Sequence, residues 1–168
     1  QASYMAGMTL PVRDDHPDYA ALTVGNYILG GGLDARLGRR VRQQEGLSYG
    51  IGSSLQASPL DERGVFAIQA ICATEKLDHL HHVIREELDR LLQDGISAEE
   101  LQTQSQGLLE QRNLRRTSDR ALVAQLATQA FVGRTMEFTR DFERQIQALT
   151  MDDVQSAMQR QIAPDRLY

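Results

Sequence analysis

The sequence has one cysteine, no tryptophan and only four prolines in 168 residues. A lone cysteine excludes an internal disulfide, and Cys72 lies in the apolar run VFAIQAICA, where we expect its thiol to be buried as a small hydrophobic group. No apolar run approaches the roughly 18 residues needed to cross a bilayer, and the first residues lack the pattern of a signal peptide. We therefore expect a soluble chain with no membrane insertion.

Positive charge is also scarce, because 18 lysines and arginines stand against 23 aspartates and glutamates, a net charge of −5. Binding to nucleic acid requires a basic face that neutralises phosphates, and this balance argues against one. Arginines gather at 36–42 and 112–120, but few aromatic side chains lie among them to stack on bases. We expect no nucleic-acid partner and interpret most of these arginines as solvated helix faces.

Hydrophobic periodicity predicts three strands, one over 2–12 and two over 47–56 and 64–73 that form a hairpin around the turn sequence SPLDERG. Helical spacing predicts helices over 15–29, 34–44, 75–94, from 97 onward, and over 118–131, 139–148 and 152–161. This order predicts one α+β domain over residues 1–168. The chain begins without methionine and ends in DRLY, typical of the start of a strand, so we expect a piece excised from a longer polypeptide.

Three consecutive glycines, Gly30 to Gly32, follow the predicted helix over 15–29. The sequence GGGLDA formally fits the G-x-G-x-x-A motif of dinucleotide-binding proteins. That motif follows a strand and needs an acidic residue about 20 positions further on, after a second strand. Neither condition is met here. We favour a tight corner between two helices that requires positive φ angles.

His79, His82 and Glu86 share one face of the predicted helix over 75–94, and two histidines with a glutamate are a chemically sensible zinc set. That face lies opposite the apolar stripe of the helix, which indicates that it is solvated. Neither H-x-x-E-H nor H-E-x-x-H occurs in the chain, and the G-x-S-x-G motif of serine hydrolases is also missing. We therefore expect this domain to hold no metal of its own.

Arg42 and Tyr49 lie seven residues apart, at the end of a predicted helix and the start of a predicted strand, with Gly46 between them. The N–H donors of arginine suit a carbonyl or carboxylate, and a tyrosine hydroxyl can donate to an oxygen that gains negative charge. A helix end that leads through a glycine into a strand can bring both side chains to one side of a sheet. From residue types alone, a surface arginine and a half-buried tyrosine are the simpler interpretation.

A resemblance to a known family favours the functional interpretation of Arg42 and Tyr49. It rests on HPDYAALTVGNYILGGGLDARLGRRVRQQEGLSYGIGSS, the strand RGVFAIQAICA and the helix pair EELDRLLQDGISAEEL. Together they resemble the second, non-zinc-binding domain of the pitrilysin and insulinase type of zinc metallopeptidases, over nearly the whole chain. Relatives of that type include the mitochondrial processing peptidases and the core proteins of the cytochrome bc1 complex. Ala35-Arg36-Leu37 departs from the Ser-Arg-Leu common in the family, which removes one hydroxyl.

The resemblance implies a mixed, mainly antiparallel sheet covered on one side by several helices, as half of a clamshell that closes around a peptide or unfolded segment. The other half, a homologous domain or a separate subunit, would bind Zn²⁺ through two histidines and a glutamate. By resemblance, Arg42 would grip backbone carbonyls of the substrate and Tyr49 would stabilise the oxyanion. This domain alone would be inactive.

The resemblance leaves two functions open. One is the metal-free half of a zinc endopeptidase, and the other is a non-catalytic scaffold or assembly subunit like the bc1 core proteins. The retained Arg42 and Tyr49 favour the first, because a scaffold has no need of donors aimed into a chamber. A dimer is compatible with either function. For the compartment, we favour the bacterial periplasm or cytoplasm over the mitochondrion.

Overall fold

A computed structural model describes all 168 residues and contains a three-stranded antiparallel sheet. The strands are β1 (Ala2–Leu10), β2 (Ser48–Ala57) and β3 (Gly64–Cys72), and their order across the sheet is β1-β3-β2. The predicted hairpin is β2 and β3, whose ends pair at Ala57 and Gly64. The first strand predicted from alternation is β1, which pairs with β3 along its whole length.

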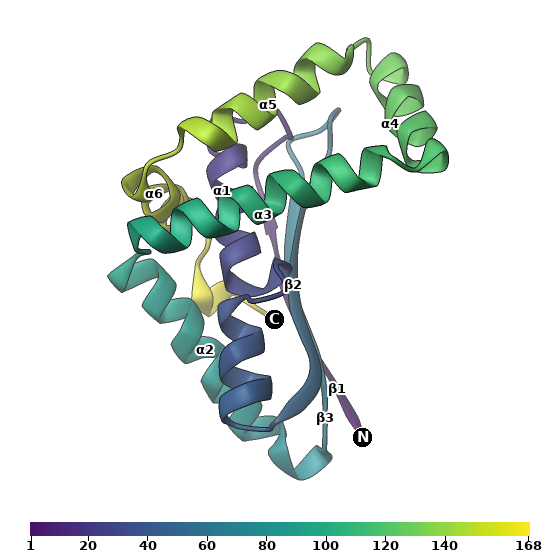
Figure 1. Cartoon of the computed structure of the whole chain (residues 1–168). Helices are drawn as coiled ribbons and strands as arrows, with labels where there is room; N and C mark the ends of the chain where they lie inside the picture. The colour runs from purple at the N-terminus through teal and green to yellow at the C-terminus, as the bar shows by residue number, and fades with distance from the viewer.

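Helices cover only one face of this sheet (Figure 1). Alternate side chains of β3, such as Phe66 and Ile68, are completely buried beneath the helices. The opposite face is open, and large apolar side chains there remain accessible, with Met5 70% and Ile71 55% exposed. Side chains of a strand alternate between the two faces, so every second residue of a strand faces the core and the residues between them face the open side. The expected fold class, an α+β domain with a one-sided sheet, is confirmed.

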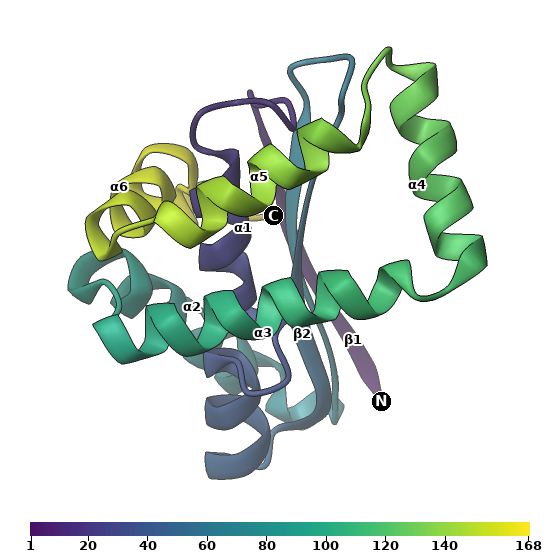
Figure 2. The same ribbon diagram turned by 45° about the horizontal axis from the view of Figure 1, so that its top comes forward.

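The helical part of the chain consists of six α-helices and shorter helical segments (Figure 2). The α-helices are α1 (Tyr19–Asn26), α2 (Leu77–Asp94), α3 (Ala98–Arg116), α4 (Asp119–Phe131), α5 (Met136–Ala148) and α6 (Met151–Gln161). Two segments are π-helical, η1 (Tyr27–Gly31) and η2 (Gly38–Gln44), and two are 3-10 turns, η3 (Thr74–Lys76) and η4 (Pro164–Arg166). None of these helices combines the length and the apolar character needed to cross a membrane.

The ends of the helices follow the predicted signals in most places. Gly95 follows α2 with a φ of +72°, a conformation that suits glycine at a helix end. The Ser97 side chain accepts a hydrogen bond from the Glu100 backbone at the start of α3. Thr150 and Asp153 form a complete capping box at the start of α6.

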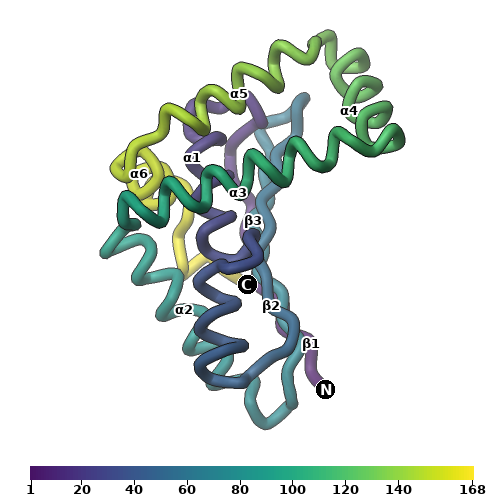
Figure 3. The backbone as a smooth tube through the Cα atoms, viewed as in Figure 1, coloured from purple at the N-terminus to yellow at the C-terminus, as the bar shows by residue number.

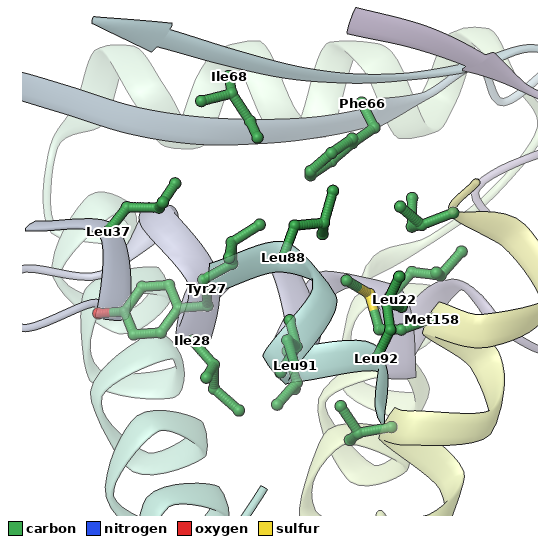
Figure 4. Packing of buried hydrophobic residues seen from close by; sticks show 14 of the residues in the cluster. Leu22, Tyr27, Ile28, Leu37, Phe66, Ile68, Leu88, Leu91, Leu92 and Met158 are labelled. Carbon is green, nitrogen blue, oxygen red and sulfur yellow. The ribbon is translucent and has the colours of Figure 1, made fainter. Parts of the chain in front are cut away.

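The core lies between the covered face of the sheet and the helices α1, α2 and α6 (Figure 4). Phe66 of β3 points toward Leu88 of α2, and Met158 of α6 lies beside Leu22 of α1 in the same layer (Figure 4). Cys72 is 4% exposed and belongs to this cluster, so the expected buried thiol is confirmed.

Helix α4 differs from the others because none of its residues is buried. It joins the ends of α3 and α5 at a distance from the rest of the chain, and the three helices form an open frame (Figure 3). Several of its apolar side chains, including Val123 and Phe131, are exposed.

Several predicted boundaries differ from the structure. The helix predicted over 139–148 begins earlier, at Met136, and the strand predicted over 2–12 ends at Leu10. The helix predicted from residue 15 begins at Tyr19, and the carboxylate of Asp18 binds Arg160 instead of capping the helix. The strand predicted at DRLY is limited to Tyr168, which exchanges two backbone hydrogen bonds with Gly7 at 2.8 and 3.1 Å. The residues before it form the 3-10 turn η4, because Pro164 fixes a helical φ at its first position.

Candidate functional site

Arg42 lies in the last turn of η2, which the sequence predicts as part of a helix over 34–44. The neighbouring Val41 is fully buried and anchors this turn, while Arg42 is exposed. Arg36 and Arg39 both pair with Glu100, at 2.6 and 3.7 Å. Arg40 is likewise paired, as described below. Among these arginines Arg42 makes no ion pair within the chain, so its guanidinium remains available to a ligand.

Tyr49 occupies a β-bulge at the start of β2. Ser48 pairs with Cys72 and Gly50 pairs with Ile71, so Tyr49 has no partner on β3. Ser48 stabilises the bulge, because its Oγ donates to Ile71 O at 2.6 Å and accepts from Gly50 N at 3.1 Å. A bulge changes the direction of a side chain at the edge of a sheet. The Tyr49 side chain is 97% exposed, which differs from the half-buried tyrosine of the simpler interpretation.

A shallow hollow of about 500 Å³ lies on the open face of the sheet and begins at Gly50, the residue after Tyr49, while neither Tyr49 nor Arg42 lines it. Gly50 and Gly52 form one side of it and contribute no side chain, while Met5, Gln69 and Ile71 line the rest of its floor. No charged side chain lines the hollow. An extended, uncharged chain segment could therefore lie on this face without leaving a buried charge unpaired.

The three glycines after α1 serve a purpose that the sequence does not show. The predicted positive φ angles are wrong, because only Gly46, Gly95 and Gly133 have them. Instead, η1 lies so close to β2 that a Cβ on Gly30 would be 2.6 Å from the backbone nitrogen of Ser53. The reason for glycine here is close backbone approach.

Two of the three histidines of α2 contact carboxylates, and the third, His81, shares a hydrogen bond with the Tyr4 hydroxyl. His79 Nε2 lies 3.0 Å from Oε2 of Glu45, a residue of the loop between η2 and β2. His82 Nε2 lies 3.3 Å from Oε1 of Glu86, which is on the same helix as His82. A hydrogen bond from His79 and the charge of Arg40 hold the pKa of the Glu45 carboxyl below its ordinary value. No three His, Cys, Asp or Glu side chains come together as a metal site, so the residues of this chain do not fit a zinc ion.

The sequence model of the family described as the peptidase M16 inactive domain matches residues 1–108 of this chain. The chain belongs to this family. A protein named as an uncharacterized zinc protease of Streptomyces coelicolor is 32% identical to this M16 inactive domain over 101 residues. That match covers 60% of this chain and 21% of the Streptomyces protein. The family assignment confirms the resemblance seen in the sequence.

Solved structures agree with this assignment. A crystal structure of a peptidase M16 inactive domain from Pseudomonas fluorescens has a TM-score of 0.82 and 30% sequence identity, covering 99% of this chain and 40% of that chain. An inactive peptidase domain of a zinc protease from Bordetella parapertussis, with a TM-score of 0.79 and 16% identity, shows the same fold over 99% of this chain and 90% of its own. This M16 inactive domain thus spans about a fifth of the Streptomyces relative that it matches.

Proposed function

We propose that this M16 inactive domain is the metal-free half of a zinc-dependent endopeptidase. Arg42 holds backbone carbonyls of a peptide substrate, and Tyr49 donates a hydrogen bond to the scissile carbonyl oxygen as it gains negative charge. The observation that carries the proposal is that both side chains are exposed and that Arg42 makes no ion pair within the chain. Tyr49 is 97% exposed on a bulge, and Arg42 is exposed and unpaired beside three paired arginines.

The surroundings of Tyr49 support a peptide as the substrate. The hollow next to it is open to the backbone at Gly50 and Gly52 and carries no charge, which suits an extended segment of polypeptide. Because the floor carries Met5 and Ile71, apolar side chains of the substrate have partners there.

The partner in this proposal is a homologous domain or subunit that binds Zn²⁺. The residues of this chain offer no metal site, so the zinc must come with that partner. The bound ion would polarise the attacking water and the carbonyl. Tyr49 would act on the same scissile carbonyl from the opposite side of the chamber, while Arg42 would hold other backbone carbonyls of the substrate. The relatives named as zinc proteases are bacterial, and one structural neighbour is named as a periplasmic protease of Escherichia coli, so we propose a bacterial enzyme of the periplasm or cytoplasm.

The test is turnover of a quenched fluorescent peptide by the complete protein with its zinc half. We expect chelation of zinc to abolish turnover and Tyr49→Phe to lower kcat by about 10² to 10³, the usual loss for one oxyanion donor. Arg42→Ala should raise KM at least as clearly as it lowers kcat, because its contact is made in the bound substrate as well as in the transition state.

Matched controls exist for both variants. Tyr168 is 89% exposed and lies outside the hollow, and Arg115 is exposed and makes no ion pair, so Tyr168→Phe and Arg115→Ala should leave both constants unchanged. A loss of less than about threefold in Tyr49→Phe would contradict the proposed role. If the folded, complete protein turns over no peptide in any form, the scaffold becomes the better hypothesis.

A further inference from the structure

The loop that joins η2 to β2 determines how Arg42 and Tyr49 stand relative to each other. It contains Glu45, Gly46 and Leu47, and Gly46 has a φ of +59°. The Leu47 amide donates to Val41 O at 2.9 Å, which closes the last turn of η2. A change in this loop would therefore move Arg42 and Tyr49 relative to each other.

Two side chains, one at the end of η3 and one in the first turn of α2, contact this loop. Lys76 Nζ donates a hydrogen bond to Gly46 O at 2.9 Å. His79, almost one turn further along, lies 3.0 Å from Glu45 Oε2. On the other side of Glu45, Arg40 Nη2 lies 2.9 Å from Oε1. The Glu45 carboxylate thus joins Arg40 of η2 to His79 of α2, which is more than 30 residues away from Glu45 in the sequence.

These contacts give His79 a role other than the zinc ligand considered from the sequence. Its imidazole bonds to a single carboxylate, that of Glu45. His82 lies on the same face of the helix and is bonded to Glu86, which itself lies 3.4 Å from Arg40 Nη2. Neither Lys76 nor His79 lines the hollow beside Tyr49. Their contacts reach only the loop, so any effect on the proposed reaction would pass through the loop.

We propose that Lys76 and His79 are positioning residues that clamp the loop of residues 45–47 and thereby hold Tyr49 at the spacing from Arg42 that the reaction needs. This inference rests on the proposed function. Gly46 makes such a clamp necessary, because glycine is the residue with the most conformational freedom and nothing lies within 4 Å of its Cβ position. The hydrogen bond from a charged ammonium to the Gly46 carbonyl restricts that freedom directly.

The size of the effect follows from the type of contact. Loss of one exposed hydrogen bond or ion pair shifts the equilibrium between the clamped and the released loop by up to about fivefold. We therefore expect Lys76→Met to lower kcat of the complete protein about threefold to fivefold and to leave KM for a peptide almost unchanged if Arg42 still binds. His79→Ala should have a smaller effect in the same direction. Lys76→Arg should restore kcat, because a guanidinium can also donate to the Gly46 carbonyl.

Two measurements on the complete protein test the clamp. The first is amide hydrogen exchange over residues 45–48, which should become faster in Lys76→Met. The control Arg90→Ala, on the same helix and paired only with Glu87, should leave that exchange unchanged. The second is a double-mutant cycle with Tyr49→Phe. If Lys76 acts by positioning the Tyr49 hydroxyl, Lys76→Met should cause almost no further loss of kcat once that hydroxyl is gone.

Each outcome separates the clamp from the proposed function. Unchanged exchange in Lys76→Met would overturn the clamp, whatever happens to turnover. Faster exchange with an equal loss of kcat in the Tyr49→Phe background would overturn positioning of Tyr49 as the reason. If Tyr49→Phe itself retains full turnover, the proposed function fails and the positioning role fails with it. In that case the faster exchange would still show that the loop is clamped.

Discussion

Gly30→Ala tests the packing that places η1 against β2. A Cβ at this position would lie 2.6 Å from Ser53 N, 2.7 Å from Ser53 Oγ and 3.0 Å from Leu37 Cδ1. The first of these atoms belongs to the backbone, so β2 itself or η1 must move. Overpacking of this kind costs about 1–3 kcal/mol, and contact with a backbone atom places Gly30→Ala near the upper end of that range.

A gain in helix propensity partly offsets this cost. Alanine is favoured over glycine in a helix by about 1 kcal/mol, so we expect a net loss of about 2 kcal/mol in the free energy of unfolding. For a chain of this size that loss lowers the Tm by about 4–8 °C in a thermal melt followed by circular dichroism.

The matched control is Gly38→Ala in η2. No atom lies within 4 Å of its Cβ position and its φ is not positive, so only the propensity term applies. We expect its Tm to rise by about 2–4 °C. If Gly30→Ala is as stable as the unchanged protein, or gains stability as Gly38→Ala does, the close approach of η1 and β2 does not explain the glycine.

Two further predictions concern ion pairs. Arg36 donates two hydrogen bonds to Glu100, at 2.8 and 2.6 Å, and one to Gly95 O. Arg36→Leu removes all three and should lower the free energy of unfolding by about 2–3 kcal/mol, measured by urea denaturation. An unchanged urea midpoint would contradict this prediction. Hydrogen bonds from Arg160 hold the pKa of the Asp18 carboxyl below its ordinary value, so its stabilisation is complete above about pH 4 and is lost as the pH falls below that. In Asp18→Asn, the urea midpoint should therefore fall less between pH 6 and pH 3 than in the unchanged protein.

Most of the fold follows from local patterns in the sequence. Alternation gave β1 and β3 because each strand has one face in the core and one face open to solvent. The ends of the helices were predicted where a local signal exists, as at Gly95 and at Thr150. The strand predicted at DRLY begins later than expected, with the pairing of Tyr168 and Gly7, because Pro164 places the residues before it in a 3-10 turn.

The candidate site was predicted only in part, for a physical reason. The positions of Arg42 and Tyr49 came from a family resemblance, while the bulge at Tyr49 arises from how Ser48 bonds to β3, which no local pattern reveals. Sequence reasoning missed Lys76 entirely. Its contact with Gly46 joins residues 30 positions apart, and the only local signal was a glycine between a helix and a strand.

The bulge has a consequence for how such a domain evolves. Tyr49 pairs with no residue of the neighbouring strand and leaves its side chain in solvent, so the core gains almost nothing from its identity. Exposed positions of this kind tolerate substitution within about 0.5 kcal/mol. After a gene duplication, one copy could therefore lose this hydroxyl in a single step and keep its fold and its partner. Under the function proposed above, such a domain can turn from a catalytic half into an assembly subunit without passing through an unstable intermediate.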